Sequence, residues 1–211
     1  MSETLASSTL RRGPFFGLTL YLIPIGVAIN FVGGQLALLL KLPVYLDAIG
    51  TILVGAICGP WAGMLTGFLS NAVNAITSPP TFAYVLCSLG FGLLAGLLGK
   101  RGWFRSWWKT LISALGFAII GGIGGACIAI VLFDGLAVGG AGIVVGGLTA
   151  LGMDTSTANF VAQFPLDLID KIPSTLIVYL VIKGLPRRIL AKVPLGHVYL
   201  DPPRPPSPEK A

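Results

Sequence analysis

A row of polar residues runs through an otherwise apolar stretch between residues 159 and 174. Its members recur at steps of three or four, which places them along one side of a helix with 3.6 residues per turn. They are Asn159, Gln163, Asp167, Asp170, Lys171 and Ser174. Ionisable groups are costly inside apolar helices and commonly mark functional sites. The stripe is therefore the first candidate for a site in this sequence.

The charged residues of this stripe admit two interpretations. Asp167 and Lys171 are four residues apart and can form an ion pair, and Asp170 can pair with its helix neighbours. One interpretation is a structural ion pair that ties the helix to an outer loop. The other is the wall of a ligand cavity, which we favour because six polar residues are more than one tie requires. Pro165 and Pro173 flank the charges, and the backbone irregularity they cause is tolerated where a helix lines a cavity.

Other polar residues within apolar stretches extend the set of candidates. Asn71 and Asn74 are three residues apart and share a helix face, and such amides suit a neutral polar ligand with an aromatic or heterocyclic part. The alternatives are hydrogen bonds between helices for the amides and a favourable interaction with the helix dipole for Asp47. The candidates for substrate binding are Asn30, Asp47, Asn71, Asn74, Tyr84, Gln163, Asp167, Asp170 and Lys171.

The composition indicates a membrane protein. Of the 211 residues, 55% are hydrophobic and 10% are charged, against about 25% charged residues in soluble domains. The 29 glycines fit closely packed membrane helices. The net charge of +6 comes without a basic face interleaved with aromatic residues, so nucleic acid is not an expected partner. We expect an all-α integral membrane protein that forms one compact bundle in the lipid bilayer.

Positive charge sets the number of spans. Twelve of the fourteen Lys and Arg residues fall into three clusters, at 11–12, 100–109 and 183–210. Short basic segments stay on the cytoplasmic side of a bilayer, so an even number of spans must separate any two clusters. Six transmembrane helices satisfy this rule and place both termini in the cytoplasm. The six apolar runs cover residues 15–40, 45–58, 61–76, 82–99, 110–133 and 159–185.

Two stretches are assigned by this parity. Residues 45–58 and 61–76 are each shorter than the roughly 20 residues of a typical span, but a turn at Gly59-Pro60 between them preserves the even count. The glycine-rich stretch 137–152 would make the count odd, so we interpret it as an outer loop that dips over the bundle. The expected domains are a cytoplasmic segment at 1–13, a six-helix membrane domain at 14–192 and a cytoplasmic, disordered tail at 193–211.

Small residues four positions apart predict close contact between helices. Gly63 and Gly67 form one such pair, and Gly26 with Asn30 is the nearest equivalent in the first run. Such pairs either pack inside the bundle or provide a docking face for another membrane subunit. For the second possibility, the candidates are Gly26, Asn30, Gly63 and Gly67.

No catalytic group of residues is evident. His197 is the only histidine and lies beyond the last apolar run. Cys58, Cys87 and Cys127 lie singly in apolar runs, which indicates buried free thiols and no metal site. We expect no cofactor. A small integral-membrane transferase acting on lipid is an alternative function, and a purely structural membrane subunit is another.

The sequence LDAIGT at residues 46–51 is followed by GPWAG at 59–63 and by Gly67. This part of the chain, from Asn30 to Asn74, resembles the substrate-binding S component of energy-coupling factor (ECF) transporters. Asp170-Lys171 is also similar to a polar patch in the sixth helix of that family. The resemblance implies a six-helix protein of the prokaryotic cell membrane that captures a vitamin or related micronutrient and is not an enzyme. It also implies a complex with a membrane coupling subunit and two ATPase subunits. Acidic residues outnumber basic ones on the outer side, which favours a cationic or neutral ligand over a dianion.

Overall fold

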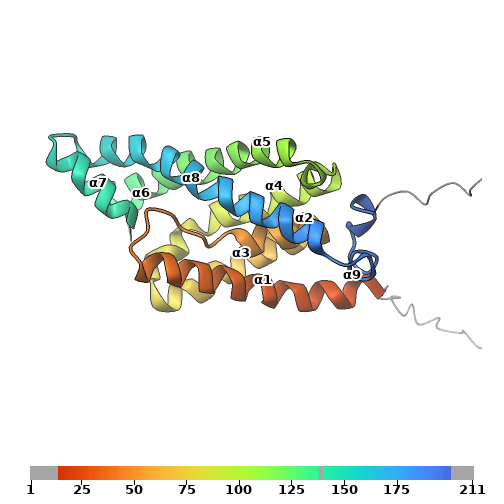
Figure 1. Cartoon of the computed structure of the whole chain (residues 1–211). Coiled ribbons are helices and arrows are strands. Elements are labelled where there is room, and N and C mark those ends of the chain that lie inside the picture. The colour runs from red at the N-terminus through yellow and green to blue at the C-terminus, as the bar shows by residue number, and fades with distance from the viewer. Residues whose placement is uncertain (1–13, 138–139, 201–211) are drawn as a thin grey trace, which may run out of the picture.

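The computed structural model describes residues 14–137 and 140–200, and its long helices lie side by side in alternating directions (Figure 1). The long α-helices are α1 Pro14–Leu39, α2 Ile49–Cys58, α3 Pro60–Thr77, α4 Val85–Lys100, α5 Trp107–Ala118, α6 Gly124–Phe133, α7 Gly140–Ala150 and α8 Thr155–Gly184. The shorter elements are the helix α9 Arg187–Leu190 and the 3-10 helices η1 Pro79–Tyr84, η2 Trp103–Arg105 and η4 Gly196–Val198. A π-helical turn, η3 Ile119–Ile123, joins α5 to α6 in one continuous helix. The described residues are thus all-helical, as expected.

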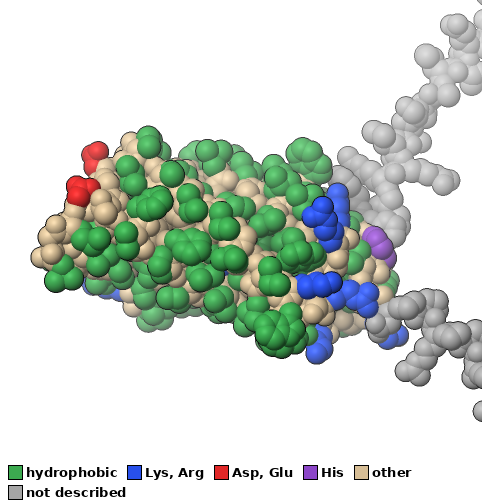
Figure 2. All heavy atoms as spheres, turned by 90° about the horizontal axis from the view of Figure 1, so that it is seen from above, with side chains coloured by type: hydrophobic (Ala, Val, Ile, Leu, Met, Phe, Trp, Pro, Cys, Tyr) green, Lys and Arg blue, Asp and Glu red, His purple; other side chains and the backbone are tan. Residues whose placement is uncertain are grey.

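The two ends of the bundle carry opposite charge (Figure 2). What we call the acidic end holds the α6–α7 and α7–α8 connections, with the exposed carboxylates Asp134 and Asp154. The basic end holds the start of α1, the α4–α5 connection and α9. Its exposed cations are Lys100, Arg101, Arg105, Lys109, Lys183, Arg187, Arg188 and Lys192. The three basic clusters of the sequence were expected on one side. The cluster at 100–109 and the described part of the cluster at 183–210 do lie at one end.

Several helices suit a lipid environment. Gly17–Leu39, Pro79–Lys100 and Trp107–Phe133 are long and apolar enough to cross a membrane. The helix α8 is also long, with 30 residues, but charged side chains interrupt its apolar character. Large exposed hydrophobic side chains such as Leu97 and Ile112 cover the sides of the bundle, where acyl chains satisfy them.

The glycine-rich stretch 137–152 does not form the expected loop. Its residues 140–150 form the helix α7, which packs on α8 at the acidic end. Ala141 and Val145 of α7 are buried together with Ala158 and Ala162 of α8. Glycine weakens an isolated helix, but here small residues allow two helices to pack closely, and this packing outweighs propensity. At 11 residues, α7 is shorter than the roughly 20 residues of a typical membrane span, as is α2 with 10 residues.

Glycines bring α2, α3 and α4 into backbone contact. The chain turns between α2 and α3 at Gly59, whose φ of 102° favours glycine, and Pro60 begins α3, as the sequence predicted. A Cβ added at Gly63 would lie 2.7 Å from the Gly55 Cα and from the Gly92 carbonyl oxygen. The predicted close packing of Gly63 is therefore confirmed as packing within the chain.

The predicted docking residues lie inside this packing. Gly63 and Gly67 face α4, where a Cβ at Gly67 would meet the backbone of Ser88, and Gly26 faces Gly50, Val54 and Thr66. The side chain of Asn30 is fully buried. We therefore correct the docking prediction, because these four positions are occupied by helices of the same chain and form no outer face.

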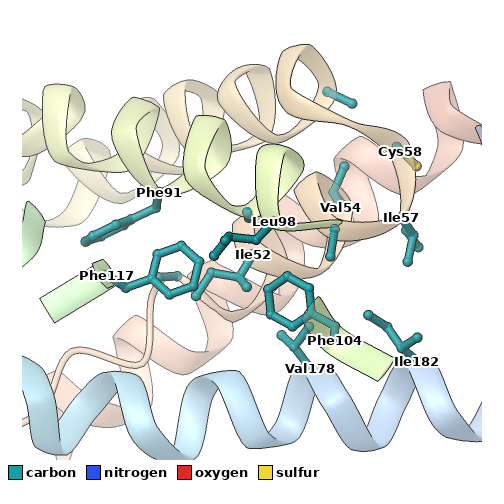
Figure 3. Close-up of a cluster of buried hydrophobic side chains, with 14 of the residues drawn as sticks. Ile52, Val54, Ile57, Cys58, Phe91, Leu98, Phe104, Phe117, Val178 and Ile182 are labelled. Carbon is teal, nitrogen blue, oxygen red and sulfur yellow. The ribbon is translucent and has the colours of Figure 1, made fainter. Parts of the chain in front are cut away.

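The apolar core occupies the half of the bundle nearer the basic end. Phe91, Phe104 and Phe117 pack between α2, α4, α5 and α8, together with Ile52 and Val178 (Figure 3). Phe91 and Phe117 meet edge to face with ring centroids 6.1 Å apart. Because this half is filled by side chains, any ligand space must lie toward the acidic end. Cys58 and Cys87 are buried free thiols as predicted, whereas Cys127 is exposed on α6 and corrects that expectation.

The ordered chain continues past residue 192, where the expected disordered tail was to begin. Val193 is buried, the backbone N–H of Leu195 donates to the Ile57 carbonyl at 2.9 Å, and the Tyr199 hydroxyl donates to the Ala56 carbonyl at 3.1 Å. Residues 193–200 thus close over the end of α2, and the predicted boundary is wrong by these eight residues. Residues 201–211 and the expected segment 1–13 lie outside the described residues.

Candidate functional site

A cavity of about 110 Å³, with polar side chains set in a largely apolar wall, lies toward the acidic end. On the scale of roughly 10–15 Å³ per water-sized probe, it holds about seven to eleven such positions, enough for a small organic molecule. Residues of α1, α3, α4, η1, η3 and α8 line it, together with the α1–α2 loop. Seven of the nine predicted substrate-binding residues line this cavity, namely Asp47, Asn71, Asn74, Tyr84, Gln163, Asp167 and Lys171.

The charged residues of α8 form a buried ion-pair cluster. Lys171 is 1% exposed, and its ammonium bonds to Asp170 and lies 3.4 Å from Asp167 Oδ1. The Lys171 Nζ atom also lies 4.7 Å from the ring centroid of Phe91. A lone buried ammonium would be costly, but two carboxylates and an aromatic face compensate it. The predicted pair between Asp167 and Lys171 is therefore present.

Asp170 fixes the α1–α2 loop instead of lining the cavity. Its Oδ1 accepts the backbone N–H groups of Tyr45 at 3.0 Å and Leu46 at 2.8 Å. Leu46 has a φ of 52°, a left-handed conformation that is costly for a non-glycine residue. The loop carbonyl of Leu46 lies so close to Gly33 on α1 that a Cβ there would overlap it. Asp170 is thus the structural tie that we weighed as an alternative, while Asp167 and Lys171 line the cavity.

Asn30 likewise serves the fold and not the cavity. Its amide nitrogen donates to Thr51 Oγ1 and Ser70 Oγ at 2.8 Å each, and its Oδ1 accepts the Gly50 N–H at 2.6 Å. These bonds join α1, α2 and α3, and they use both the nitrogen and the oxygen of a fully buried amide. The substrate-binding prediction for Asn30 and Asp170 is corrected, because neither residue lines the cavity and both are committed to tertiary bonds.

Three nitrogen donors of the cavity wall, on Asn71, Gln163 and Lys171, are engaged within the protein. Asn71 donates to Ser88, and Gln163 Nε2 donates to the Tyr45 hydroxyl at 2.7 Å. Lys171 is held by the carboxylates of α8. The bonds of Asn71 and Gln163 join different segments of the chain, whereas those of Lys171 stay within α8, and each fixes the direction of a cavity side chain. The wall is therefore preorganised on its donor side.

Two acceptor atoms of the cavity wall have no partner. They are Asp167 Oδ2 and Asn74 Oδ1, on side chains that are 3% and 6% exposed. Asn159 Oδ1 is also unpartnered, but Asn159 does not line the cavity and its amide nitrogen donates to the Gly135 carbonyl at 2.9 Å. A buried unpaired acceptor is costly, and a ligand that donates to it would recover that cost.

The π-helical turn η3 creates the space for Asp167. Gly121 in this turn faces α8, and a Cβ at this position would overlap the Asp167 carboxylate. Single π-helical turns are frequent at functional sites because they change the direction that a helix face presents. No pattern in the sequence indicates the π turn or the contact of Gly121 with Asp167.

Several cavity residues escaped the sequence prediction. The rings of Tyr45 and Phe91 line the cavity, as does the hydroxyl of Ser88. Tyr45 and Phe91 sit in apolar runs where an aromatic residue is ordinary core, so composition alone does not distinguish them. Burial raises the pKa of the Tyr45 hydroxyl, so at neutral pH it stays protonated while it accepts the Gln163 bond. Within residues 14–137 and 140–200, no group of three or more His, Cys, Asp or Glu is arranged to hold a metal ion.

The fold and the cavity together define a class: a multi-pass membrane protein with an internal cavity. The family model for the ECF transporter, substrate-specific component, matches residues 18–193, and the chain belongs to this family. The match agrees with the resemblance seen in the sequence. No curated protein and no solved structure matches the chain. The family motif LDAIGT acquires a structural meaning here, since Leu46 bonds to Asp170, Asp47 lines the cavity and Gly50 packs on Gly26.

Proposed function

We propose that this chain captures a vitamin or related micronutrient at the outer face of a prokaryotic cytoplasmic membrane. It delivers the ligand through a separate membrane coupling subunit, driven by two ATPase subunits. Family membership supports the transport role, and an S component is a binding subunit and not an enzyme. The observation that carries the proposal is the cavity, whose wall includes buried polar side chains such as Asn74, Asp167 and Lys171 in a bundle with an apolar surface.

We propose six membrane crossings: α1, α2, α3, η1 with α4, α5 through α6, and α8. The helix α7 then lies at the outer surface without crossing. The gathering of basic side chains at one end supports a cytoplasmic position for that end and for both termini. On this orientation the cavity lies in the outer half of the bundle, where it meets a ligand arriving from outside the cell.

The orientation is tested with single exposed cysteines and a membrane-impermeant maleimide applied to intact cells. Cys127 is first replaced by Ser because its exposed thiol would react with the maleimide. The buried thiols Cys58 and Cys87 are kept. We expect Leu151→Cys, at the acidic end, to be labelled in intact cells. Arg188→Cys, at the basic end, is labelled only after the membrane is opened. The reverse pattern would contradict the proposed orientation.

Capture is tested by identifying the small molecule that stays with the detergent-purified chain after washing. Mass spectrometry of the denatured sample is expected to find one molecule close to one equivalent per chain. Asn74→Leu places a larger apolar side chain in the cavity wall and removes this molecule, whereas Val73→Leu, one position away and outside the lining, keeps it. An empty wild-type chain, or equal retention by both variants, would argue against capture in this cavity.

A further inference from the structure

The cavity wall has an unbalanced charge. Asp47 and Asp167 line the cavity and Asp170 bonds to its wall, whereas Lys171 is the single cation among the described residues of this cluster. With all four groups ionised, three carboxylates face one ammonium, and the cluster carries a formal charge of −2. Buried charge without compensation is unfavourable. A buried excess of carboxylate charge is relieved either by a proton on a carboxylate or by a cation that enters the cavity.

The unpaired hydrogen-bonding atoms of the cavity wall likewise favour a cation over an anion. The nitrogen donors of Asn71, Gln163 and Lys171 are all spent on partners within the protein. The two open positions, Asp167 Oδ2 and Asn74 Oδ1, are both acceptors. An anionic ligand would face two carboxylates and would find the donors of Asn71, Gln163 and Lys171 occupied, while a ligand with N–H groups would find both open acceptors.

The apolar part of the wall adds aromatic rings. Tyr45, Tyr84 and Phe91 all line the cavity. Phe91 and Tyr45 already have the Lys171 ammonium 4.7 and 6.0 Å from their ring centroids, which shows that this aromatic wall lies beside a cation. Aromatic faces attract cations and also stack on flat rings. The lining therefore suits a ring with a positively charged nitrogen group.

We infer that the ligand is an organic cation, an aromatic or heteroaromatic ring bearing protonated N–H donors, with Asp167 Oδ2 and Asn74 Oδ1 as its acceptors. The inference rests on the proposed capture function and specifies its substrate class. Asp47 adds the second carboxylate that balances the ligand charge. Lys171 does not bind the ligand; it holds Asp167 in place through Oδ1 and leaves Oδ2 to the ligand.

Three ring compounds of nearly the same shape test this inference: benzamidine, which is a cation, benzamide, which is neutral, and benzoate, which is an anion. Each is added at about 10 mM to the washed full-length chain in detergent, a concentration that fills most sites of millimolar Kd. We expect benzamidine to raise the melting temperature and the other two to leave it unchanged. A larger effect of benzoate, equal effects of all three, or no effect of benzamidine overturns the inference.

Matched carboxylate variants localise the effect. Asp167→Asn and Asp47→Asn are expected to weaken benzamidine binding about tenfold or more, because a charged hydrogen-bond partner is lost. Asp134→Asn removes an exposed carboxylate at the same end and leaves binding unchanged. Equal affinity in all three variants overturns the inference. The charge of the molecule that co-purifies with the chain separates the two proposals: an anion refutes the cation inference and leaves capture intact, and a cation supports both.

Discussion

The Asp170 carboxylate on α8 accepts the backbone N–H of Leu46 at 2.8 Å, across 124 positions of the sequence. This bond holds Leu46 at a positive φ, and with it the loop that carries Tyr45 and Asp47 into the cavity wall. The same carboxylate pairs with Lys171. One buried side chain therefore links the charge cluster of α8 to the loop that shapes the cavity.

Replacing Asp170 by Asn is expected to loosen this loop. The amide still accepts a backbone bond, but it removes one of the charges that compensate Lys171, at a cost of about 3–5 kcal/mol for breaking a buried pair. Thermal unfolding in detergent and the release rate of the co-purified ligand measure the effect, and both should change. Asp134→Asn, on the surface, is the control. Comparable melting temperatures for the two variants would show that the tie is unimportant.

Replacing Lys171 by Met is expected to be more damaging than replacing either partner. The change leaves both Asp167 and Asp170 buried without a cation, so the loss should exceed the cost of about 3–5 kcal/mol for breaking one buried pair. The double variant Asp170→Asn with Lys171→Met removes one of these stranded charges and should recover part of the lost melting temperature. Lys183→Met, exposed near the end of the same helix, should unfold like the wild type. A double variant less stable than Lys171→Met would contradict the ion-pair explanation.

Gly121→Ala is expected to abolish ligand retention. The new methyl group would overlap the Asp167 carboxylate and push it from its position beside η3. The variant should still purify as a folded monomeric bundle, because only the carboxylate needs to move. Gly146→Ala on α7, where an added Cβ meets nothing within 4 Å, should keep the ligand. Normal ligand binding by the Gly121 variant would mean that Asp167 is not a contact.

Gly92→Ala is expected to destabilise the bundle by about 1–3 kcal/mol or more, the usual cost of overpacking. A Cβ at Gly92 would overlap the backbone of Gly63 and Met64, and backbone atoms cannot rotate away. The melting temperature in detergent reports the loss. Gly17→Ala on the open side of α1 is the matched change and should cost nothing. If both variants melt alike, the close contact of α3 and α4 has been misjudged.

Removing residues 193–211 is expected to lower stability, whereas removing 201–211 keeps every described contact. The longer deletion loses the bonds to Ala56 and Ile57 and exposes the end of α2. Tyr199→Phe isolates one of these bonds and should cost about 0.5–1.5 kcal/mol. Burial raises the pKa of Tyr199, so its hydroxyl still donates at neutral pH, and its contribution declines only at strongly alkaline pH. Equal melting temperatures of the two truncated chains would contradict this role.

Most of the candidate site was accessible from local sequence patterns. The spacing of Gln163, Asp167 and Lys171 places them on one helix face, and Asn71 and Asn74 follow the same rule. Five of the seven candidates that line the cavity follow this rule, and the other two, Asp47 and Tyr84, lie outside the α-helices. Asn30 and Asp170 are as polar and as buried as the others, but their bonds run to distant segments. No helical period shows which buried polar residue meets a ligand and which meets the backbone.

What the sequence determined by itself is the membrane class, the family and the helical faces, because apolar length, basic clusters and residue period act locally along the chain. Tertiary contacts decided the rest. Gly63 and Gly67 became internal contacts because α4 lies against them, and residues 140–150 became a helix because α8 gives them a surface to pack on. The open acceptors of Asp167 and Asn74 exist only after every other polar group has found its partner in the folded bundle.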